Sequence, residues 1–538
     1  MKRRSFLKNT LATGAILSIN ACQSSNKEKE INQSESVDFS LNEKTISAII
    51  SAYKNGSLTS AQVTQLYLDR IQAIDRSGPG LNAVIEVNPD ALEKAKSRDK
   101  DLGNGKVKGP LHGIPIMLKD NIDTAGKMMT TAGSLALEGN YAAENSWVAQ
   151  KLEEAGAIII AKTNLSEWAN FRSNRSSSGW SGRGGQTRNP YIIDRNPCGS
   201  SAGSGVAVSA NMCVAAIGTE TNGSIVCPSS INGIVGIKPT VGLVSRAGIV
   251  PIAHSHDTSG PMTRTVEDAA IVLGALTGID EKDSYTKRSS TNSYSDYTSF
   301  LDANSLQNKR IGIARHFFGF HEKVDQLMEQ AIKDLQNLGA ETIDLDKEDL
   351  NGKSGEDAYS VLLYEFKHDL NKYLKKCSSD IKVRSLEELI KFNKDHAEKE
   401  LPYFGQEILL NAQEKGDLNS EEYKKALEHV LKSNGPEGID YVIDKYEIDV
   451  IIAPTGGPSW PVDVINGDHF MGGSSSPAAR SGYPNITVPM GFIHDLPVGV
   501  SFFAEAFSEP KLIGFAYAYE QATKHRKPPE FFPTFEIK

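Results

Sequence analysis

The chain has 538 residues, of which 39% are hydrophobic and 23% are charged, and its formal net charge is −9. This composition is ordinary for a globular protein with a sizeable core. The negative charge, together with the lack of a long basic block in the body of the chain, argues against nucleic acid as a partner.

The first residues are typical of a targeting segment rather than of the fold. Arg3-Arg4-Ser5-Phe6-Leu7-Lys8 matches a twin-arginine export signal, and the apolar stretch after it is too short for a durable transmembrane helix. Ile19-Asn20-Ala21-Cys22 resembles a bacterial lipobox, which would make Cys22 a lipidated residue; the alternative is a plain export signal cleaved nearby. We therefore expect an export signal at 1–22, a flexible tether at 23–40, and a periplasmic or membrane-anchored protein whose only membrane contact is this anchor.

Hydrophobic spacing predicts helices and strands in alternation, which indicates a layered α/β fold. Residues 45–76 carry two helical patterns, and Thr59 followed by Gln62 forms a capping box for the second. The predicted strands are 114–118, 157–162, 214–217, 310–315, 450–453, 486–489 and 498–503. The predicted helices between them are 147–154, 203–212, 324–338 and 512–522.

Two stretches depart from this alternation. Residues 166–200 are polar, with repeated Ser, Gly, Arg and Asn, and we expect a long ordered loop there. Residues 355–446 are charged and helical, with helices predicted at 386–392, 401–412 and 420–431. We predict a single large α/β/α domain at 41–538, with a helical cap inserted at about 355–446.

The four remaining cysteines are Cys198, Cys213, Cys227 and Cys377, and their spacing is not that of metal ligands. A protein exported by the twin-arginine route folds in a reducing compartment, so we expect free buried thiols, although the even count leaves a disulfide open. The histidines are scattered, and we predict no metal site.

Two serines and a lysine are the candidates for chemistry. Ser200 lies in Cys198-Gly-Ser-Ser-Ala-Gly-Ser, Ser224 lies in Thr219-Glu-Thr-Asn-Gly-Ser-Ile, and Lys119 directly follows the predicted strand 114–118. Amide hydrolysis needs a nucleophile, a base and donors for the oxyanion. The small residues before Ser224 allow successive backbone N–H groups to converge on one point, as an oxyanion site requires. From composition alone, a plain Gly/Ser turn is the favoured interpretation.

The segment Gly199 to Thr240 resembles the signature segment of the amidase signature family. The resemblance covers about 45–275 and 445–525 strongly and the middle of the chain weakly. Its other landmarks are Ala161-Lys-Thr-Asn-Leu-Ser-Glu-Trp, Gly236-Ile-Lys-Pro-Thr, Asp257-Thr-Ser-Gly-Pro-Met and Tyr517-Ala-Tyr-Glu-Gln-Ala. It implies an α/β/α amidase-signature domain with a mixed, twisted central sheet.

The resemblance also implies the roles of the site residues. Ser224 matches the nucleophile, Ser200 the relay serine that follows a cis peptide bond, and Lys119 the base. A buried lysine loses the hydration that favours its charge, so its pKa falls and a neutral amine becomes accessible. The residues that match the oxyanion site are Thr221, Asn222, Gly223 and Ser224. The charged residues interpreted as structural are Lys162, Lys238 and Asp257.

Within the family, the chain is most similar to bacterial peptide amidases, which remove the C-terminal amide of peptides, releasing ammonia without a cofactor. The cues include Asn164-Leu-Ser-Glu-Trp-Ala-Asn-Phe-Arg and Ser475-Ser-Pro-Ala-Ala. Asn170 is matched to the pocket loop and is a candidate for substrate binding, with a loop-stabilising role as the alternative. Cys198 and Asn222 depart from the glycines of many members. The expected partner is a short-peptide or small-molecule amide, with no obligate protein partner.

Several alternatives remain open. The same site would suit an amidase of aryl, aliphatic or fatty acyl amides. The chain could also be a tRNA-dependent amidotransferase subunit, which an export signal argues against, or a non-catalytic surface lipoprotein. Gly199-Ser-Ser-Ala-Gly203 fits a nucleophile elbow around Ser201, but the preceding residues make a poor strand. Ser51-Ala-Tyr-Lys54 fits a β-lactamase motif without its companion motifs.

Overall fold

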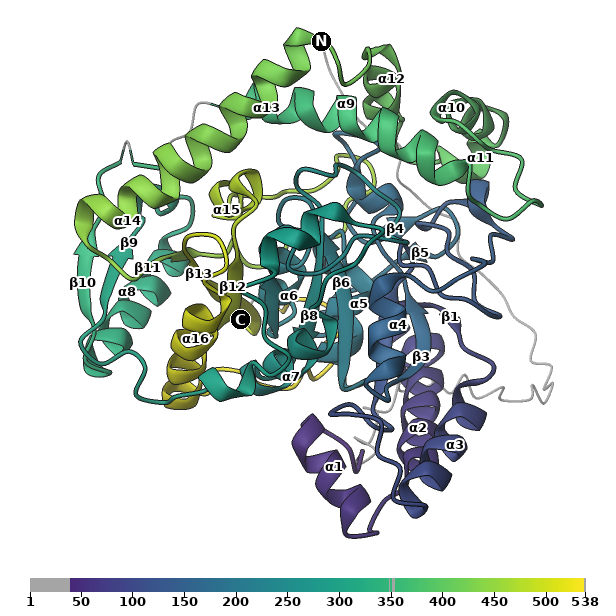
Figure 1. The fold of residues 1–538 in the computed structure, drawn as a ribbon, viewed down its shortest axis with the longest axis horizontal. Coiled ribbons are helices and arrows are strands. Elements are labelled where there is room, and N and C mark those ends of the chain that lie inside the picture. Colours follow the sequence, from purple (N-terminus) through teal and green to yellow (C-terminus); the bar gives the residue numbers. More distant parts are fainter. Residues whose placement is uncertain (1–38, 348, 351–353, 537–538) are drawn as a thin grey trace, which may run out of the picture. The chain divides into compact units, whose positions relative to one another are not determined.

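A computed structural model describes residues 39–347, 349–350 and 354–536 (Figure 1). The predicted export signal at 1–22 and residues 23–38 of the predicted tether lie outside these residues. The chain from Glu43 onward forms one compact unit.

Among the described residues, none of the helices combines the length and the apolarity that a membrane crossing requires.

An eleven-stranded mixed sheet lies at the centre of this unit, as predicted (Figure 1). In spatial order its strands are β1 (Val84–Val87), β3 (Ile158–Thr163), β2 (Pro115–Lys119), β6 (Ala215–Glu220), β8 (Thr258–Thr263), β7 (Val235–Lys238), β12 (Asn485–Ile493), β13 (Leu496–Phe503), β11 (Val450–Pro454), β9 (Arg310–Ile313) and β10 (Glu341–Asp344). The strands β3, β2 and β6 pair in parallel, as do β11, β9 and β10, while the remaining pairs are antiparallel. A separate two-stranded sheet joins β4 (Trp180–Ser181) to β5 (Gly185–Gln186).

The first group of helices surrounds or follows the sheet strands. It comprises α1 (Ile46–Lys54), α2 (Ser60–Arg70), α3 (Ala91–Gly103), α4 (Trp147–Glu154), α5 (Ala202–Ser209), α6 (Val226–Ile231), α7 (Val266–Leu276), α8 (Glu322–Asn337), α15 (Ser476–Ser481) and α16 (Glu509–Thr523). The capping box at α2 is confirmed, because Thr59 accepts from the Gln62 backbone and the Gln62 side chain accepts from the Thr59 backbone. The helix predicted at 147–154 is confirmed with the same bounds.

The second group of helices occupies the charged stretch. It comprises α9 (Gly355–Leu374), α10 (Leu386–Asp395), α11 (Ala397–Glu400), α12 (Glu407–Glu414), α13 (Glu421–Asn434) and α14 (Tyr441–Tyr446). The long helices α9 and α13 run across the top of the view, with α10, α11 and α12 beside them (Figure 1). The helix predicted from residue 401 begins only at Glu407, because Pro402 disfavours helical geometry at the residue before it.

The strands of the predicted α/β alternation are present at nearly the predicted places. β2, β3 and β6 are buried along their whole length, and each begins with a short apolar run, which is the pattern that located them in the sequence. β6 extends to Glu220, three residues beyond its predicted end, since it pairs with β8 over its full length. The prediction missed β8 because its sequence, Thr258-Ser-Gly-Pro-Met-Thr, carries no strand pattern of its own.

An apolar cluster joins the helical stretch to the 166–200 loop. Trp168 and Phe171, from the predicted 166–200 loop, are buried with Phe366 and Leu370 of α9 and Leu389 of α10. The rings of Phe171 and Phe366 lie 5.0 Å apart between centroids. The loop therefore takes its shape from the helical stretch as well as from the sheet.

A buried ion cluster reinforces the same junction. The guanidinium of Arg172 pairs with the carboxylate of Glu167 and lies 3.7 Å from that of Glu400, and the three side chains are almost fully buried. The guanidinium carbon of Arg172 lies 4.3 Å from the ring centroid of Phe404 and 5.1 Å from that of Trp180. Burial raises the pKa of Glu167, and the nearby Glu400 adds to this effect while Arg172 opposes it.

The cysteines correct one expectation. Cys198 and Cys227 form a disulfide, with 6.2 Å between their Cα atoms, so the expectation of free thiols is wrong for this pair. The cysteines lie 29 residues apart, and they meet because the segments preceding α5 and α6 are in contact. Cys213 and Cys377 are free, and burial raises the pKa of each thiol to about 12.

We expect Arg172→Met to destabilise the protein by about 3–5 kcal/mol, because it leaves two buried carboxylates without their counter-charge. Urea unfolding followed by circular dichroism measures this change. Arg175→Met, at an exposed position of the same loop, is the matched control and should change stability by less than about 0.5 kcal/mol. Equal stability of the two variants would show that the cluster contributes nothing net.

Candidate active site

Lys119 lies at the end of β2, next to the parallel strand β6. Its side chain is completely buried, and its Nζ lies 2.7 Å from Ser200 Oγ. The other contacts of Nζ are with Thr219, at 2.8 Å to Oγ1 and 3.2 Å to the backbone carbonyl. Asn121 Nδ2 also donates to Thr219 Oγ1, at 3.0 Å. Thr219 therefore fixes the amine against Ser200.

Burial lowers the pKa of Lys119 to about 7. The negative charges of Asp257 and Glu220 raise it, but by less than the loss of hydration lowers it. A substantial fraction of the amine is therefore unprotonated near neutral pH, where an ordinary lysine is almost fully charged.

Ser200 stands two residues before α5, and the peptide bond between Gly199 and Ser200 is cis, as the resemblance implied. The side chain is fully buried. The carbonyl of Ser200 accepts from Ser166 N–H at 3.1 Å, which attaches it to the loop that follows β3.

Ser224 stands two residues before α6, in the turn after β6. It is 9% exposed, whereas Lys119 and Ser200 are not exposed at all. The two serine segments are in contact, because Ser201 N–H donates to the carbonyl of Ser224 at 3.2 Å. Within the part of the chain that the structure describes, no hydrogen bond joins the hydroxyl of Ser224 to that of Ser200.

The turn from Thr221 to Ser224 is shaped by the carboxylate of Glu220. This carboxylate accepts from the N–H groups of Gly223 and Ile225, both at 2.8 Å, and of Val226 at 3.0 Å. The N–H of Gly223, predicted to be an oxyanion donor, is thus already engaged. The backbone N–H groups of Thr221, Asn222 and Ser224 have no acceptor among the described residues.

The side chains of the turn are also held from outside. Thr221 Oγ1 donates to Asp257 at 2.6 Å, and burial raises the pKa of this carboxyl group to about 6. Asn222 Oδ1 accepts from Ser475 Oγ at 2.7 Å, and Asn222 Nδ2 donates to Ser476 Oγ at 3.3 Å. Asp257, interpreted from sequence as structural, therefore positions a residue of the turn.

A cavity of about 1040 Å³ reaches the turn at Thr221, but Lys119, Ser200 and Ser224 are not among the residues that line it. Thr219, Thr221 and Asp257 line it from the sheet side. The helical stretch contributes a further wall through Asp369, Lys372, Tyr373, Lys376 and Cys377.

Asn170 follows Ala169, which lines this cavity. Trp168, Ala169 and Asn170 all have left-handed backbone conformations, with φ of 52°, 54° and 70°. Such conformations are uncommon for residues other than glycine and concentrate at functional sites. Asn170 Oδ1 is buried and has no hydrogen-bond partner among the described residues. It is thus an acceptor that no described residue uses.

One group of side chains among the described residues has the chemistry and spacing of metal ligands, namely His254, Glu365 and Asp369. Each is already bonded within the protein. His254 Nδ1 lies 2.7 Å from Asp369 Oδ2, and Glu365 accepts from Ser255 Oγ at 2.9 Å and from Tyr423 OH at 2.7 Å. The group joins the 254–256 turn to α9 and α13.

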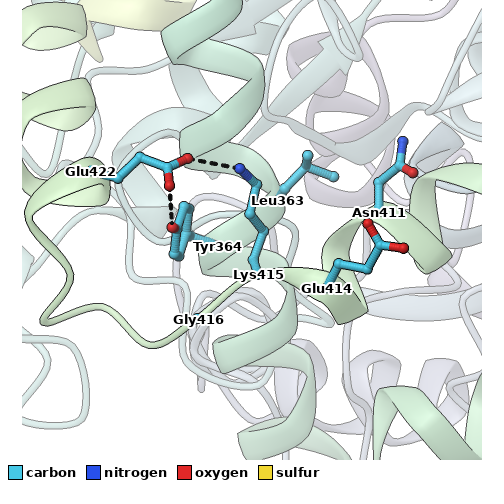
Figure 2. A pocket seen from close by; sticks show the side chains of 7 residues that line it. All are labelled: Leu363, Tyr364, Asn411, Glu414, Lys415, Gly416 and Glu422. Atoms are coloured by element: carbon cyan, nitrogen blue, oxygen red, sulfur yellow. Dashed lines mark hydrogen bonds and ion pairs between the residues drawn. The ribbon is translucent and has the colours of Figure 1, made fainter.

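A second cavity, of about 420 Å³, lies within the helical stretch between α9, α12 and the start of α13 (Figure 2). Its polar side chains satisfy one another: the carboxylate of Glu422 accepts from Lys415 and from the Tyr364 hydroxyl, each at 2.9 Å. None of the predicted site residues lines it.

Two residues of the site were missed in the sequence. Thr219 and Glu220 end β6 directly before the Ser224 turn, and both contact that turn or Lys119. The signal available in the sequence was Glu220, an acidic residue three positions before Gly223, whose carboxylate could accept from the N–H groups of the turn. Its significance depends on which way the turn folds back, and the local sequence does not specify that.

The sequence profile of the amidase family matches residues 62–513. A probable amidase of Arabidopsis thaliana is 42% identical, over 92% of both chains. The native peptide amidase of Stenotrophomonas maltophilia superposes with a TM-score of 0.87 at 48% identity, covering 93% of this chain and all of that one. A peptide amidase in complex with the competitive inhibitor chymostatin gives a TM-score of 0.88 at 49% identity, covering 91% of this chain and 99% of that one.

These matches, on a site with a buried lysine beside a serine, define the class of protein. The chain belongs to the amidase signature family, and it is a hydrolase of carbon–nitrogen bonds. The solved structures it resembles include peptide amidases.

Proposed function

We propose that this amidase removes the C-terminal amide of peptides through an acyl-enzyme on Ser224, with Ser200 as the relay and Lys119 as the base. The observation that carries the proposal is the buried Lys119 amine, with its lowered pKa, 2.7 Å from Ser200 Oγ. A lysine in this state accepts a proton near neutral pH, which ordinary lysines do not.

The proposed reaction has two halves. Ser224 Oγ attacks the amide carbon while its proton passes through Ser200 to neutral Lys119. The C–N bond then breaks, and the same proton returns through Ser200 to the leaving nitrogen, giving ammonia and an acyl-enzyme. Water attacks the acyl-enzyme by the same proton route and releases the free acid. The missing Ser224–Ser200 hydrogen bond does not oppose this route, since such bonds often tighten only with substrate present.

The oxyanion would be held by backbone N–H groups of the turn. Of the four residues predicted, Thr221, Asn222 and Ser224 keep N–H groups without an acceptor in the described residues, whereas Gly223 donates to Glu220. One such donor typically contributes about 2.7–4 kcal/mol of transition-state stabilisation. Glu220 then acts as a positioning residue that aims the other donors.

The peptide-amide substrate is supported by the cavity and by the similar solved structures. A volume of about 1040 Å³ is large enough for a short peptide. Asn170, which follows the lining residue Ala169 and has an unpartnered Oδ1, stays the candidate acceptor for a substrate N–H. Aryl, aliphatic and fatty acyl amides are the competing substrates, and a non-catalytic lipoprotein or an amidotransferase subunit are the competing functions.

We expect purified protein beginning at residue 23 to release ammonia from C-terminally amidated dipeptides, and Ser224→Ala to abolish this release with the fold intact. Simple aliphatic amides and an anilide are assayed beside the peptides. Ser201→Ala tests the rival nucleophile. Because Ser201 Oγ is bonded to the backbone of Thr219, we expect this variant to lose activity only in part. Activity in Ser224→Ala would reject the mechanism, and activity only on the other amides would reject the peptide substrate.

We expect kcat/KM to rise with pH to a plateau, with a midpoint near 7, because raising the pH deprotonates Lys119 and creates the base. The measurement is initial rate against pH from about 5.5 to 9 at low substrate concentration. Lys119→Ala should reduce the rate by about 10²–10⁴-fold. A flat profile in the wild type would remove Lys119 from the role of base.

We also propose that the protein is exported and held at a membrane surface by a lipid on Cys22, on the basis of Arg3-Arg4 and the lipobox-like Ile19-Asn20-Ala21-Cys22. Fractionation of bacteria that express the full chain tests this. We expect the wild type in the membrane fraction and Cys22→Ala outside it. A Cys22→Ala protein that stays in the membrane fraction to the same extent would contradict the anchor.

A further inference from the structure

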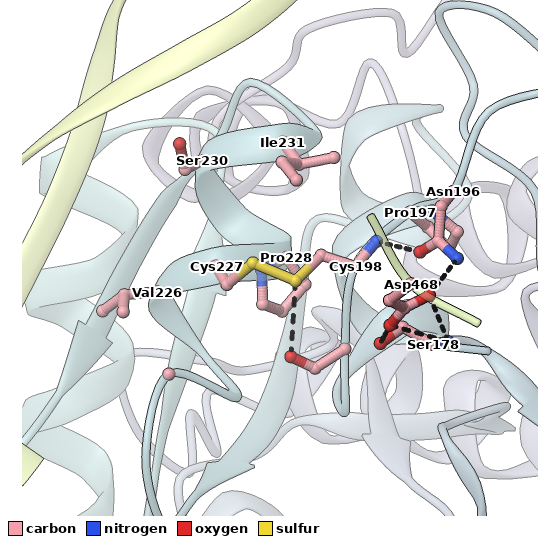
Figure 3. Close-up of a disulfide and its surroundings, with 12 residues drawn as sticks. Ser178, Asn196, Pro197, Cys198, Val226, Cys227, Pro228, Ser230, Ile231 and Asp468 are labelled. Atoms are coloured by element: carbon pink, nitrogen blue, oxygen red, sulfur yellow. Dashed lines mark hydrogen bonds between the residues drawn. A yellow bond between two sulfur atoms is a disulfide. The ribbon is translucent and has the colours of Figure 1, made fainter. Parts of the chain in front are cut away.

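We propose that the Cys198–Cys227 disulfide is a positioning device for the reaction, holding the nucleophile Ser224 in register with the relay Ser200. The inference rests on the proposed roles of these two serines. It assigns a function to a covalent bond between the segments that carry them (Figure 3).

The disulfide connects the two segments at short range from each serine. Cys198 precedes Ser200 by two residues, and Cys227 follows Ser224 by three. The Cα atoms of the cysteines are 6.2 Å apart, and the backbone hydrogen bond from Ser201 N–H to the Ser224 carbonyl lies on the other side of Ser200. The two segments are therefore joined both before and after Ser200.

The Cys198 end of the disulfide is firmly anchored. Cys198 N–H donates to Asn196 Oδ1 at 2.8 Å, and Asn196 Nδ2 donates to Asp468 Oδ1 at 3.0 Å (Figure 3). Asp468 also accepts from Ser178 N–H at 3.0 Å and from Trp460 Nε1 at 3.1 Å. Cys198 is 5% exposed, whereas Cys227 is only partly buried. These hydrogen bonds therefore hold Cys198 in place at its end of the disulfide.

The Cys227 end connects directly to the nucleophile turn. Cys227 lies in the first turn of α6, and its N–H donates to the carbonyl of Gly223 at 2.8 Å. A displacement of Cys227 therefore moves Gly223, and with it Ser224. The sulfurs pack in a small apolar cluster with Ile231 and Trp460, which limits the motion of this end.

The two serines differ in how their own side chains are held. Ser200 Oγ is bonded to Lys119, whereas the hydroxyl of Ser224 makes no hydrogen bond to the rest of the described residues. The position of Ser224 relative to Ser200 is thus set by the backbone, by the Glu220 carboxylate that holds the turn, and by the disulfide. A misplacement of about 1 Å at a reacting group can reduce the rate by 10²-fold, so loss of this link should be visible in kcat.

Reduction provides the first test. Dithiothreitol transfers two electrons and two protons to the disulfide, giving two thiols and leaving its own cyclic disulfide. At 25 °C we expect the reduced wild type to remain folded, with kcat on an amidated dipeptide at least tenfold lower and KM within about twofold. Removal of the reductant and addition of oxidised glutathione should restore the rate. Titration with a thiol reagent counts two additional free thiols in the reduced form.

A double variant provides the second test, without a reductant. Cys198→Gly suits the left-handed φ of 56° at this position, and Cys227→Ala suits a helix, so neither substitution strains the backbone. We expect the double variant to show the lower kcat, an unchanged KM and no response to dithiothreitol. Cys213→Ala, at a buried free cysteine, is the matched control and should keep both the wild-type rate and the response.

The readouts separate positioning from simple stabilisation. A disulfide that only stabilises the fold lowers the melting temperature but leaves kcat at 25 °C unchanged, and that result would overturn the inference. Unchanged kcat in wild type with both thiols proven free would overturn it as well. If the oxidised wild type hydrolyses no amide, the proposed function itself fails, which is a distinct outcome from equal rates in the oxidised and reduced forms.

Discussion

The burial of one amine, that of Lys119, is the constraint on which the site depends. An amine removed from water keeps its charge only with help from nearby negative groups, and Glu220 and Asp257 supply part of that help. The same two carboxylates also hold the turn that follows β6, through Gly223 and Thr221. The charges that tune the base are therefore also the groups that shape the turn carrying the nucleophile. Electrostatics and geometry of the site are coupled through these two residues.

The sheet explains why these groups meet. Parallel pairing of β2 with β6 brings the end of β2, at Lys119, beside Thr219 near the end of β6. Both serine segments then start helices that leave this edge, α5 and α6. The helical stretch from α9 to α14 contributes no reacting group, but it forms a wall of the large cavity. Reaction and substrate preference thus depend on different parts of the chain.

Patterns in the sequence predicted those features that depend on local residues. The apolar runs of β2 and β3 and the capped helix α2 follow from periodicity and capping, and the family resemblance of the motifs around Ser200 and Ser224 pointed to amide hydrolysis. The features that depend on contacts between distant residues escaped prediction. β8 is a strand only because β6 and β7 pair with it, and Cys198 meets Cys227 only because two helix starts lie together. Likewise, the hydrogen bond from Gly223 N–H to the Glu220 carboxylate depends on how the turn folds.

The left-handed run Trp168–Ala169–Asn170 ties the shape of the site to the stability of the helices around it. Left-handed geometry costs about 1–2 kcal/mol for each residue with a side chain, so the three together hold several kcal/mol. Trp168 and Phe171 are packed against α9 and α10, and this packing offsets that cost. If those helices unfolded, the loop could leave its left-handed geometry, and the free energy released would favour unfolding of the helices. Conversely, a ligand that binds Asn170 in its present geometry would also stabilise α9 and α10 through this packing, by thermodynamic linkage.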